Sequence, residues 1–544
     1  MAIDTETPTD SATVRPEDAD QLTAKLRRAA VAALPPERLM PDRQPAYVAS
    51  WIYVFGVLTL ASLAVVILTG VVLAIFGPSW WHASTVGLFV NSLHLWSVEV
   101  FFFTMVVHLW GKFFMAAWRG RRALTWMVGA ICFLASIATA FTGYLSQQNF
   151  DSQWIGTQAK DGLNASGVGA YFNVLNVGQM LVWHVILLPL ALILLVSAHI
   201  LLVRRRGVCP PLPAAEPREP AAEDPDYPRS PDPAAEWSGA KRRYDLIKEL
   251  VSALGVVVLA TVVLSALFSS PDPKAVTAAR WANANPADFL TTAVSELDRT
   301  SGTATYGPPY THTPGAGQTI VDSLSLQRLV GVHIPIDTAQ AFVLTPLSIG
   351  SKNNPPLAKA LASYSSASPA QRRAWTSAYT KALDGVTFRD GAPVITPGNY
   401  GPVALMMRDL LAQAQSGGLD GALVSTSHFY QTDYTKPLLF FSDGAYLENL
   451  AAQDNLLGDQ WGMMNETGNY PGQAWLWLYT FWYQVPPLKT SDNADAQIWA
   501  IMALLSLGLV LVPFLPGVRS LPRHLRVYRV IWRDYYRRAE ATRE

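Results

Sequence analysis

The sequence predicts an all-α membrane core with a soluble domain of mixed secondary structure inserted outside the membrane. Half of the 544 residues are hydrophobic and only 15% are charged, which is typical of a membrane protein that also carries a sizeable soluble part. Apolar stretches long enough to cross a bilayer as helices occur six times; they cover residues 51–76, 86–110, 124–145, 177–203, 246–268 and 497–514. The long polar segment between the last two stretches is the predicted inserted domain.

Lysine and arginine residues predict the orientation of these helices. They cluster before the first stretch, between the second and third, between the fourth and fifth, and after the sixth. All of these clusters lie on one side of the membrane if the N-terminus is cytoplasmic, as the positive-inside rule requires. We therefore expect a multi-pass protein of the cell membrane with cytoplasmic termini and an extracytoplasmic inserted domain.

The remaining segments complete the predicted organisation. The stretch at about residues 209–239 is rich in proline and alanine, which is typical of a flexible linker. Aromatic residues between arginines at the C-terminus predict a basic amphipathic helix at the membrane interface, or one docked on a partner subunit. The expected units are residues 1–46 (cytoplasmic N-terminal segment), 47–206 (four-helix core), 207–243 (cytoplasmic linker), 244–270 (fifth helix), 271–470 (extracytoplasmic domain), 471–487 (aromatic helix), 495–517 (sixth helix) and 518–544 (amphipathic tail).

Four histidines inside the apolar stretches form two pairs. His94 and His108 are fourteen positions apart, and His184 and His199 are fifteen apart. Either spacing returns to nearly the same helix face about 21 Å further along the axis. A single histidine there would most simply be a hydrogen-bonded core residue, but two matched pairs favour ligation, because imidazole in hydrocarbon is costly without a partner. The sequence therefore predicts a four-helix dihaem bundle, each haem held by two histidines, plus two further transmembrane helices.

Charge and cysteine content exclude other partners and cofactors. The formal net charge is zero, so bulk charge indicates no nucleic-acid partner. The two cysteines, Cys132 and Cys209, lie in an apolar and a polar segment, and we expect no disulfide between them. The chain contains no Cys-x-x-Cys-His motif and too few cysteines for an iron–sulfur cluster of its own.

At these histidines the chain resembles the cytochrome b subunit of quinol:cytochrome c reductases and its chloroplast counterpart. The fifteen-residue interval is similar to the chloroplast and Gram-positive variant. Gly56 and Gly70 in the first stretch, and Gly129 and Gly143 in the third, are each fourteen apart. In the family, paired glycines on these helices let the haems pack against the backbone, although small residues also serve helix packing.

The resemblance implies roles for the ligands. His94 and His184 would hold a low-potential haem b near the outer face of the membrane. His108 and His199 would hold a high-potential haem b near the cytoplasm.

It also implies roles for four charged residues. Arg204 falls where chloroplast-type members carry an arginine near the inner haem, and Lys112 and Arg119 could neutralise its propionates. Positive-inside anchoring is the alternative explanation of all three. Glu249 falls where an aspartate lines the family's inner quinone site, so it would deliver protons to the quinone, unless it is a plain interfacial charge.

The outer quinol site departs from the family pattern. Where the family has Pro-Trp-Gly-Gln, residues 146–149 read Ser-Gln-Gln-Asn. The stretch from Pro471 to Pro487 is similar to the family's aromatic helix, but residues 472–474 read Gly-Gln-Ala in place of Glu-Trp-Tyr. Asn91 stands where an arginine is usual. The glutamate credited with accepting the quinol proton is therefore missing, and residues 272–470 have no counterpart.

Glu99 is the remaining charge within the predicted membrane helices. It follows His94 by five residues, so it points about 140° away from the histidine face. We expect it to face a neighbouring helix or subunit. A role in a proton path is the alternative, since intramembrane carboxylates are often functional.

These observations predict transmembrane electron transfer through two b-type haems, as the cytochrome b subunit of a bc-like quinol/quinone oxidoreductase rather than a complete enzyme. The quinone would be menaquinone or ubiquinone. Expected partners are iron–sulfur or cytochrome c subunits, or another extracytoplasmic redox protein, in an oligomeric complex surrounded by membrane lipid. Two alternatives stay open: a haem-bearing anchor passing electrons between an extracytoplasmic dehydrogenase or redox protein and the quinone pool, and a non-redox scaffold.

Overall fold

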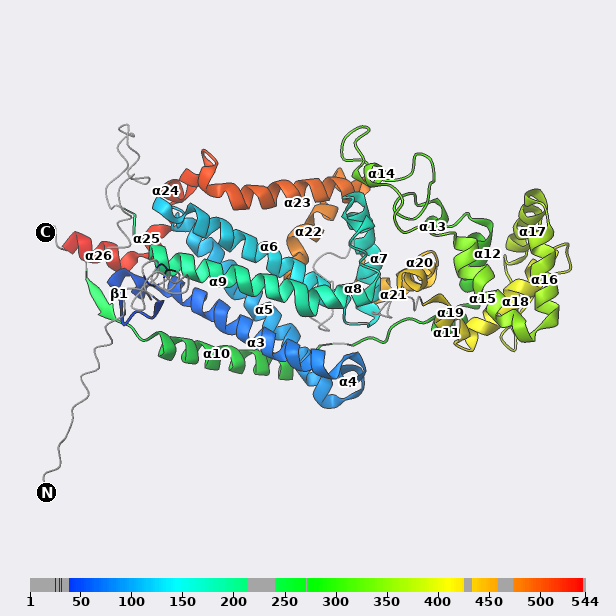
Figure 1. Cartoon of the computed structure of the whole chain (residues 1–544), viewed down its shortest axis with the longest axis horizontal. Coiled ribbons are helices and arrows are strands. Elements are labelled where there is room, and N and C mark those ends of the chain that lie inside the picture. Colours follow the sequence, from blue (N-terminus) through cyan, green and yellow to red (C-terminus); the bar gives the residue numbers. More distant parts are fainter. Residues whose placement is uncertain are drawn as a thin grey trace, which may run out of the picture.

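The computed structural model describes residues 39–212, 240–270, 272–424, 433–457 and 473–541, together with Lys25, Ala29 and Val31. The described residues include six helices that are long and apolar enough to cross a membrane, which confirms that part of the prediction. Their bounds are Trp51–Phe76, Thr85–Phe114, Gly120–Leu145, Val177–Arg206, Leu246–Phe268 and Ala494–Phe514. They run roughly alongside one another, and the inserted domain lies beyond the ends that are remote from both termini (Figure 1).

Four of these helices pack together around a shared interior. They are α3 (Val54–Phe76), α5 (Thr85–Phe114), α6 (Ala123–Leu145) and α9 (Leu188–Arg206). Helix α3 packs along α5, α5 contacts α6, and α6 packs along α9; the π-helical turn before α9 returns to contact α3. The other two membrane-length helices pack on the outside: α10 (Leu246–Phe268) against α3 and α5, and α23 (Ala494–Leu511) against α6.

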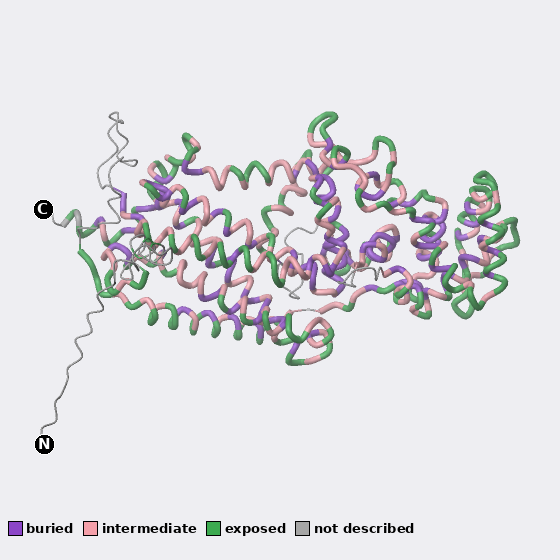
Figure 2. Tube along the Cα trace, viewed as in Figure 1, coloured by how far each residue is buried: buried purple, intermediate pink, exposed green. Residues whose placement is uncertain are grey.

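The outward faces of the membrane-length helices are exposed (Figure 2), and many of their exposed residues are large and apolar. On α9, Leu190 and Leu194 have exposed fractions of 55% and 63%, and on α10, Val251 and Leu259 reach 62% and 65%. Side chains of this kind are stable at a surface only when lipid or another apolar partner covers it. Burial is instead concentrated in α7 (Phe150–Ala165) and the inserted domain.

The inserted domain is helical rather than mixed in the part that the structure describes. A single short hairpin, β3 (Thr387–Arg389) paired with β4 (Ala392–Val394), is its strand content there. The helices are α11 (Ala278–Ala284), α12 (Pro286–Asp298), α13 (Gly302–Thr305), α14 (Leu326–Val330), α15 (Thr345–Gly350), α16 (Pro355–Ser366), α17 (Pro369–Ala382), α18 (Val403–Gln415), α19 (Gly418–Leu423), α20 (Thr435–Ser442) and α21 (Ala445–Gln453), with a π-helix at Ala339–Leu344.

The inserted domain and α7 share one hydrophobic core. Trp154 of α7 is buried within it and donates a hydrogen bond to the carbonyl of Leu456 over 2.9 Å. The Gln153 amide exchanges two hydrogen bonds with the backbone of Val276, at 3.0 and 2.7 Å. Helix α7 begins with a capping box formed by Asn149 and Ser152. The inserted domain therefore packs as one unit with the segment that follows α6.

The C-terminal tail is not the continuous amphipathic helix that its pattern predicts. It breaks into α24 (Leu521–Leu525), α25 (Tyr528–Ile531) and α26 (Arg533–Ala541), and Arg526 adopts a φ of 54° at the first break. Trp532 is only 1% exposed and packs with Tyr528 against residues that precede α3. The aromatic side of this segment thus covers protein. Nearby, β1 (Arg43–Pro45) pairs antiparallel with β2 (Lys241–Arg243).

Candidate functional site

The four predicted histidines lie in two layers between the central helices. The layer on the side of the inserted domain, called the outer layer below, is formed by His94 of α5 and His184 of the π-helical turn. The ring centroids of these histidines are 6.2 Å apart, with their planes at 86°. Two imidazoles bound to opposite sides of one metal ion would have centroids roughly 6.4 Å apart, since each metal–nitrogen bond is about 2.0–2.1 Å long. The observed separation therefore leaves room for one metal ion between the rings.

An apolar cavity of about 320 Å³ opens at this layer. Both histidine rings line it, and its other walls come from α3, α5, α6 and α9, including Gly70, Val98 and Leu192. Ligand pockets with few polar groups and apolar walls bind flat hydrophobic cofactors well. The two imidazoles are the groups in its lining best suited to bind a metal.

Hydrogen bonds on the Nδ1 atoms orient the two outer rings. The His94 Nδ1 lies 2.9 Å from the Thr69 hydroxyl, and the His184 Nδ1 lies 2.9 Å from the Thr139 carbonyl. With Nδ1 held in this way, Nε2 is left available to bind a metal. Sequence reasoning missed Thr69 and Thr139, because their roles depend on contacts between helices.

The predicted glycines each face one of the histidines. A β-carbon built on any of them would crowd an imidazole: on Gly56 it lies 3.0 Å from the His108 ring, on Gly70 3.1 Å from His94, on Gly129 2.9 Å from His199, and on Gly143 it collides with His184. In the structure the atoms nearest to each glycine belong to an imidazole ring, so each glycine and its histidine belong to the same layer.

A π-helical turn explains the unequal histidine spacing. It spans Trp183–Leu187, between α8 (Val177–Val182) and α9, and includes His184. A π-bulge inserts one extra residue into an α-helix and is frequent at functional sites. The extra residue turns a fourteen-residue interval into fifteen, and His184 still faces His94.

The inner layer consists of His108 and His199, with Lys112 close to both rings. The Lys112 ammonium lies 4.2 Å from the ring centroid of Tyr53. Within the described ranges, the Nδ1 of His108 has no hydrogen-bond partner. Such a buried polar atom calls for a further partner. Lys112 therefore places a cation beside this layer.

Three further residues, which were predicted to act near the inner layer, form hydrogen bonds with groups other than the histidines. They are Arg119, Arg204 and Glu249. Arg119 donates hydrogen bonds to the Cys209 sulfur over 3.3 Å and to the Pro210 carbonyl over 2.5 Å, and so fastens the chain that follows α9. Glu249 and Arg204 both bond to the Tyr244 hydroxyl, and burial together with the Glu249 hydrogen bond raises the pKa of Tyr244 to about 12. Sequence reasoning missed Tyr244, which joins two of the predicted residues.

The outer end of the bundle carries a hydrogen-bonded group around Gln147. Asn91 donates to the Gln147 side chain over 3.2 Å, and the His82 Nε2 lies 2.8 Å from the Gln147 carbonyl. The His82 Nδ1 lies 2.6 Å from an Asp272 carboxylate oxygen, and this hydrogen bond raises the pKa of His82. Asn91 therefore takes part in closing the outer end.

The aromatic segment crosses the outer part of α5 and α6. It forms η9 (Ala474–Leu476), α22 (Trp477–Phe481) and η10 (Trp482–Gln484); Pro471 and Gly472 lie outside the described residues. The Trp475 ring stacks on Phe102 of α5, with centroids 6.0 Å apart, and meets Tyr144 of α6 edge-on at 6.3 Å. Its indole N–H donates to the Gln473 side chain over 2.7 Å.

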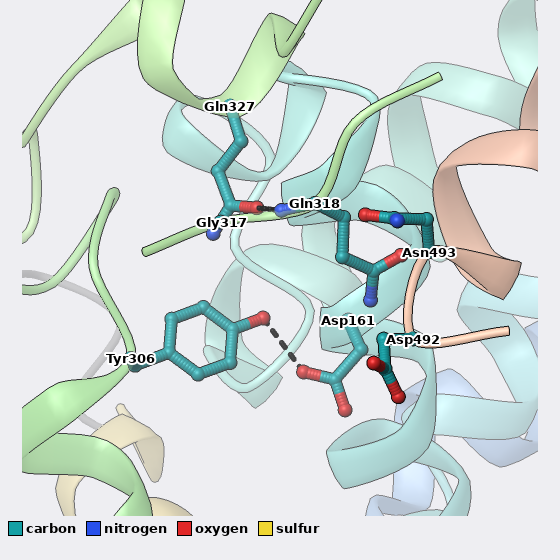
Figure 3. A pocket seen from close by; sticks show the side chains of 7 residues that line it. All are labelled: Asp161, Tyr306, Gly317, Gln318, Gln327, Asp492 and Asn493. Atoms are coloured by element: carbon teal, nitrogen blue, oxygen red, sulfur yellow. Dashed lines mark hydrogen bonds between the residues drawn. The ribbon is translucent and has the colours of Figure 1, made fainter. Parts of the chain in front are cut away.

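A second, polar cavity of about 270 Å³ lies between α7, the inserted domain and the start of α23 (Figure 3). The Tyr306 hydroxyl donates a hydrogen bond to Asp161 across it over 2.6 Å. Its other lining residues are Gly317, Gln318, Gln327, Asp492 and Asn493. None of the predicted site residues lines this cavity, so it is separate from the histidine layers.

Residues 99–279 match the sequence family described as cytochrome b(N-terminal)/b6/petB, and the match includes three of the four histidines. The cytochrome bc complex cytochrome b subunit of Chlorobaculum thiosulfatiphilum is 29% identical over 191 residues, which cover 31% of this chain and 44% of that protein. The menaquinol:cytochrome c reductase cytochrome b subunit of Geobacillus thermodenitrificans is 26% identical over 204 residues, 32% of this chain and 88% of that protein.

A chain of a solved hyperthermophilic respiratory Complex III aligns over 73% of this chain and 97% of its own length, at 16% identity and a TM-score of 0.30, which is too low to bear on function. The sequence relatives match about a third of this chain, and this chain spans less than half of the Chlorobaculum protein. The family match contains Gly129 and Gly143 together with His108, His184 and His199, whereas Gly56, Gly70 and His94 precede it. The part of the chain from residue 99 to residue 279 is thus similar to the cytochrome b(N-terminal)/b6/petB family, and the relatives that match about a third of the chain are cytochrome b subunits.

Proposed function

We propose that this chain carries electrons across the membrane through two b-type haems, as the cytochrome b subunit of a bc-like quinol/quinone oxidoreductase. The observation that supports this most directly is the opposed pair His94 and His184, 6.2 Å apart at an apolar cavity. His108 and His199 would hold the second haem. Bound haem supplies one-electron redox chemistry at its iron, and the protein supplies the ligands, their orientation and a dry environment.

The distance between the layers suits this role. Fourteen residues of α-helix separate the two layers by about 21 Å, most of the roughly 30 Å hydrocarbon core of a bilayer. One layer would therefore lie near each membrane face. With the termini cytoplasmic, the His94 layer is the outer one and the inserted domain lies outside, where iron–sulfur, cytochrome c or other redox partners would dock.

A second candidate function is a haem-bearing anchor that receives electrons from an extracytoplasmic redox protein. The insertion favours it, because it adds a large folded surface that joins the outer end of the bundle through α7. The two functions share the same haem route and differ in what reacts at the outer face. Proteins that co-purify from mild detergent would distinguish them.

The first test of both candidate functions is an optical spectrum of the purified protein. Reduced-minus-oxidised difference spectra should show a b-type band, and haem quantitation should give two haems per chain. Absence of such a band from well-folded protein would eliminate both functions and leave a scaffold.

The Thr69→Val variant should weaken the outer haem and spare the inner one. The substitution keeps the shape of the side chain but removes the oxygen that orients His94. Loss of a second-shell partner typically lowers metal affinity by about 10–100-fold. Haem retention during dilution in detergent would measure this effect. Thr59→Val is the matched control, since among the described residues the Thr59 hydroxyl bonds only to the carbonyl of Phe55 in its own helix.

The Glu249→Gln variant should slow the reaction with quinone at the cytoplasmic side. We propose that Glu249, held with Arg204 on the Tyr244 hydroxyl, supplies protons to the quinone, and loss of a general acid typically lowers rates by about 10²–10⁴-fold. The rate at which an added quinone reoxidises the reduced haems would report the change. Lys248→Gln, an exposed neighbour, should leave that rate within about twofold; equal rates in wild type and Glu249→Gln would exclude the role.

A further inference from the structure

The side chain of Glu99 is the unusual feature of the outer half of α5. It lies well inside a membrane-length helix. Its Oε1 atom is buried and accepts no hydrogen bond from any residue in the described part of the chain. A carboxylate in a membrane interior is costly unless it pairs with another group, and residues of this kind are usually functional. A ligand that donates a hydrogen bond would satisfy the free oxygen.

The surroundings of Glu99 indicate what that ligand is. The carboxylate lies against the backbone amide of Ala474, where the aromatic segment contacts α5. Phe102, three residues further along α5, shares this side of the helix and stacks on Trp475, which also meets Tyr144. Glu99 thus stands beside a group of three aromatic rings. Such a group packs well against a planar ring that carries a hydroxyl.

The position of Glu99 relative to the outer cavity completes the argument. Its neighbours Val98, Phe101 and Phe102 line the cavity that contains His94 and His184. Five residues of helix separate Glu99 from His94, about 7.5 Å along the axis and on a different face. A ligand bound at Glu99 would therefore be close to the outer haem position without occupying it.

We propose that Glu99 accepts a hydroxyl proton from a quinol bound against Phe102, Trp475 and Tyr144, a step that rests on the proposed quinol-linked function. The quinol O–H bond breaks with its electron pair retained by the quinol oxygen, and an O–H bond forms on the carboxylate. The products are a quinol monoanion and a neutral carboxylic acid, so charge and atoms balance. The electrons leave afterwards, one to the outer haem and one to an iron–sulfur or cytochrome partner, and the proton of the second hydroxyl passes to water, which leaves the quinone.

The test compares Glu99→Gln with the exposed control Glu448→Gln in the complex within native membranes. The probe is a short-chain quinol, and the rate of quinol-dependent haem reduction is measured. Glutamine keeps the shape of the side chain but cannot take up a proton, so we expect a fall of about 10²–10⁴-fold for Glu99→Gln and less than twofold for Glu448→Gln. Glu99→Asp, which retains the acid, should recover part of the rate.

A second measurement does not depend on turnover. Addition of the same short-chain quinol to wild-type protein should change a carboxyl C=O band in the infrared difference spectrum. That change should vanish in Glu99→Gln. The proposal is overturned if Glu99→Gln keeps the wild-type rate and band, or if it loses haem, which would make Glu99 structural. Failure of the proposed function is distinguishable: wild-type protein would then lack haem or would not be reduced by quinol at all.

Discussion

The His108→Ala and His199→Ala variants should each retain one haem instead of two. Removal of either imidazole leaves the inner haem with a single axial ligand, while the outer layer, about 21 Å away along the helix, keeps both. The remaining spectrum should be that of the outer haem. His94→Ala and His184→Ala should give the converse result, with only the inner haem left. Haem quantitation and redox titration of the purified variants would measure the change.

His312→Ala serves as the control, because His312 is exposed in the inserted domain and lies in neither histidine layer. It should keep both haems. Two haems in His108→Ala or His199→Ala would contradict the assignment of the inner layer. A variant that loses both haems yet elutes as a folded species would show that the layers do not bind independently.

The Gly143→Val variant should abolish the outer haem. A β-carbon at this position already collides with the His184 ring, so valine must displace either the imidazole or the α6 backbone. Overpacking of this kind typically destabilises a protein by about 1–3 kcal/mol, and here it would also move a ligand. We expect the outer haem occupancy to fall at least about tenfold, in line with the cost of misplacing a ligand or its support.

Gly255→Val is the matched control for that experiment. Gly255 also lies in a membrane-length helix, α10, but a β-carbon there meets no atom within 4 Å. The control should keep both haems and near wild-type thermal stability. A Gly143→Val protein with a full two-haem spectrum would show that the glycine is not needed for the position of His184.

The sequence predicted the features that depend on local patterns. Hydropathy predicted six membrane-length helices, since each must be apolar along its length. Helical periodicity predicted a common face for each pair of histidines, and the family resemblance pointed to the glycines. Both properties are encoded within single helices. The sequence also predicts one aromatic helix from Pro471 to Pro487, but the structure divides Ala474–Gln484 into short helical turns.

The features that the sequence did not predict depend on contacts between distant segments. Thr69 and Thr139 orient ligands from neighbouring helices, and Tyr244 joins Glu249 to Arg204. No periodicity marks such residues. The C-terminal tail could not be predicted fully for the same reason. An amphipathic pattern does not tell whether lipid or protein covers the apolar side of a helix. Here Trp532 packs on protein.

The common core of α7 and the insertion has a consequence for protein engineering. Excision of residues 272–457 would strip the covering from Trp154, Leu175 and Met180, all of which are buried in that core. Met180 lies only four positions before His184. A shortened protein of the size of its relatives would therefore need new polar side chains along α7 and α8 before it could be expected to keep its outer ligand in place.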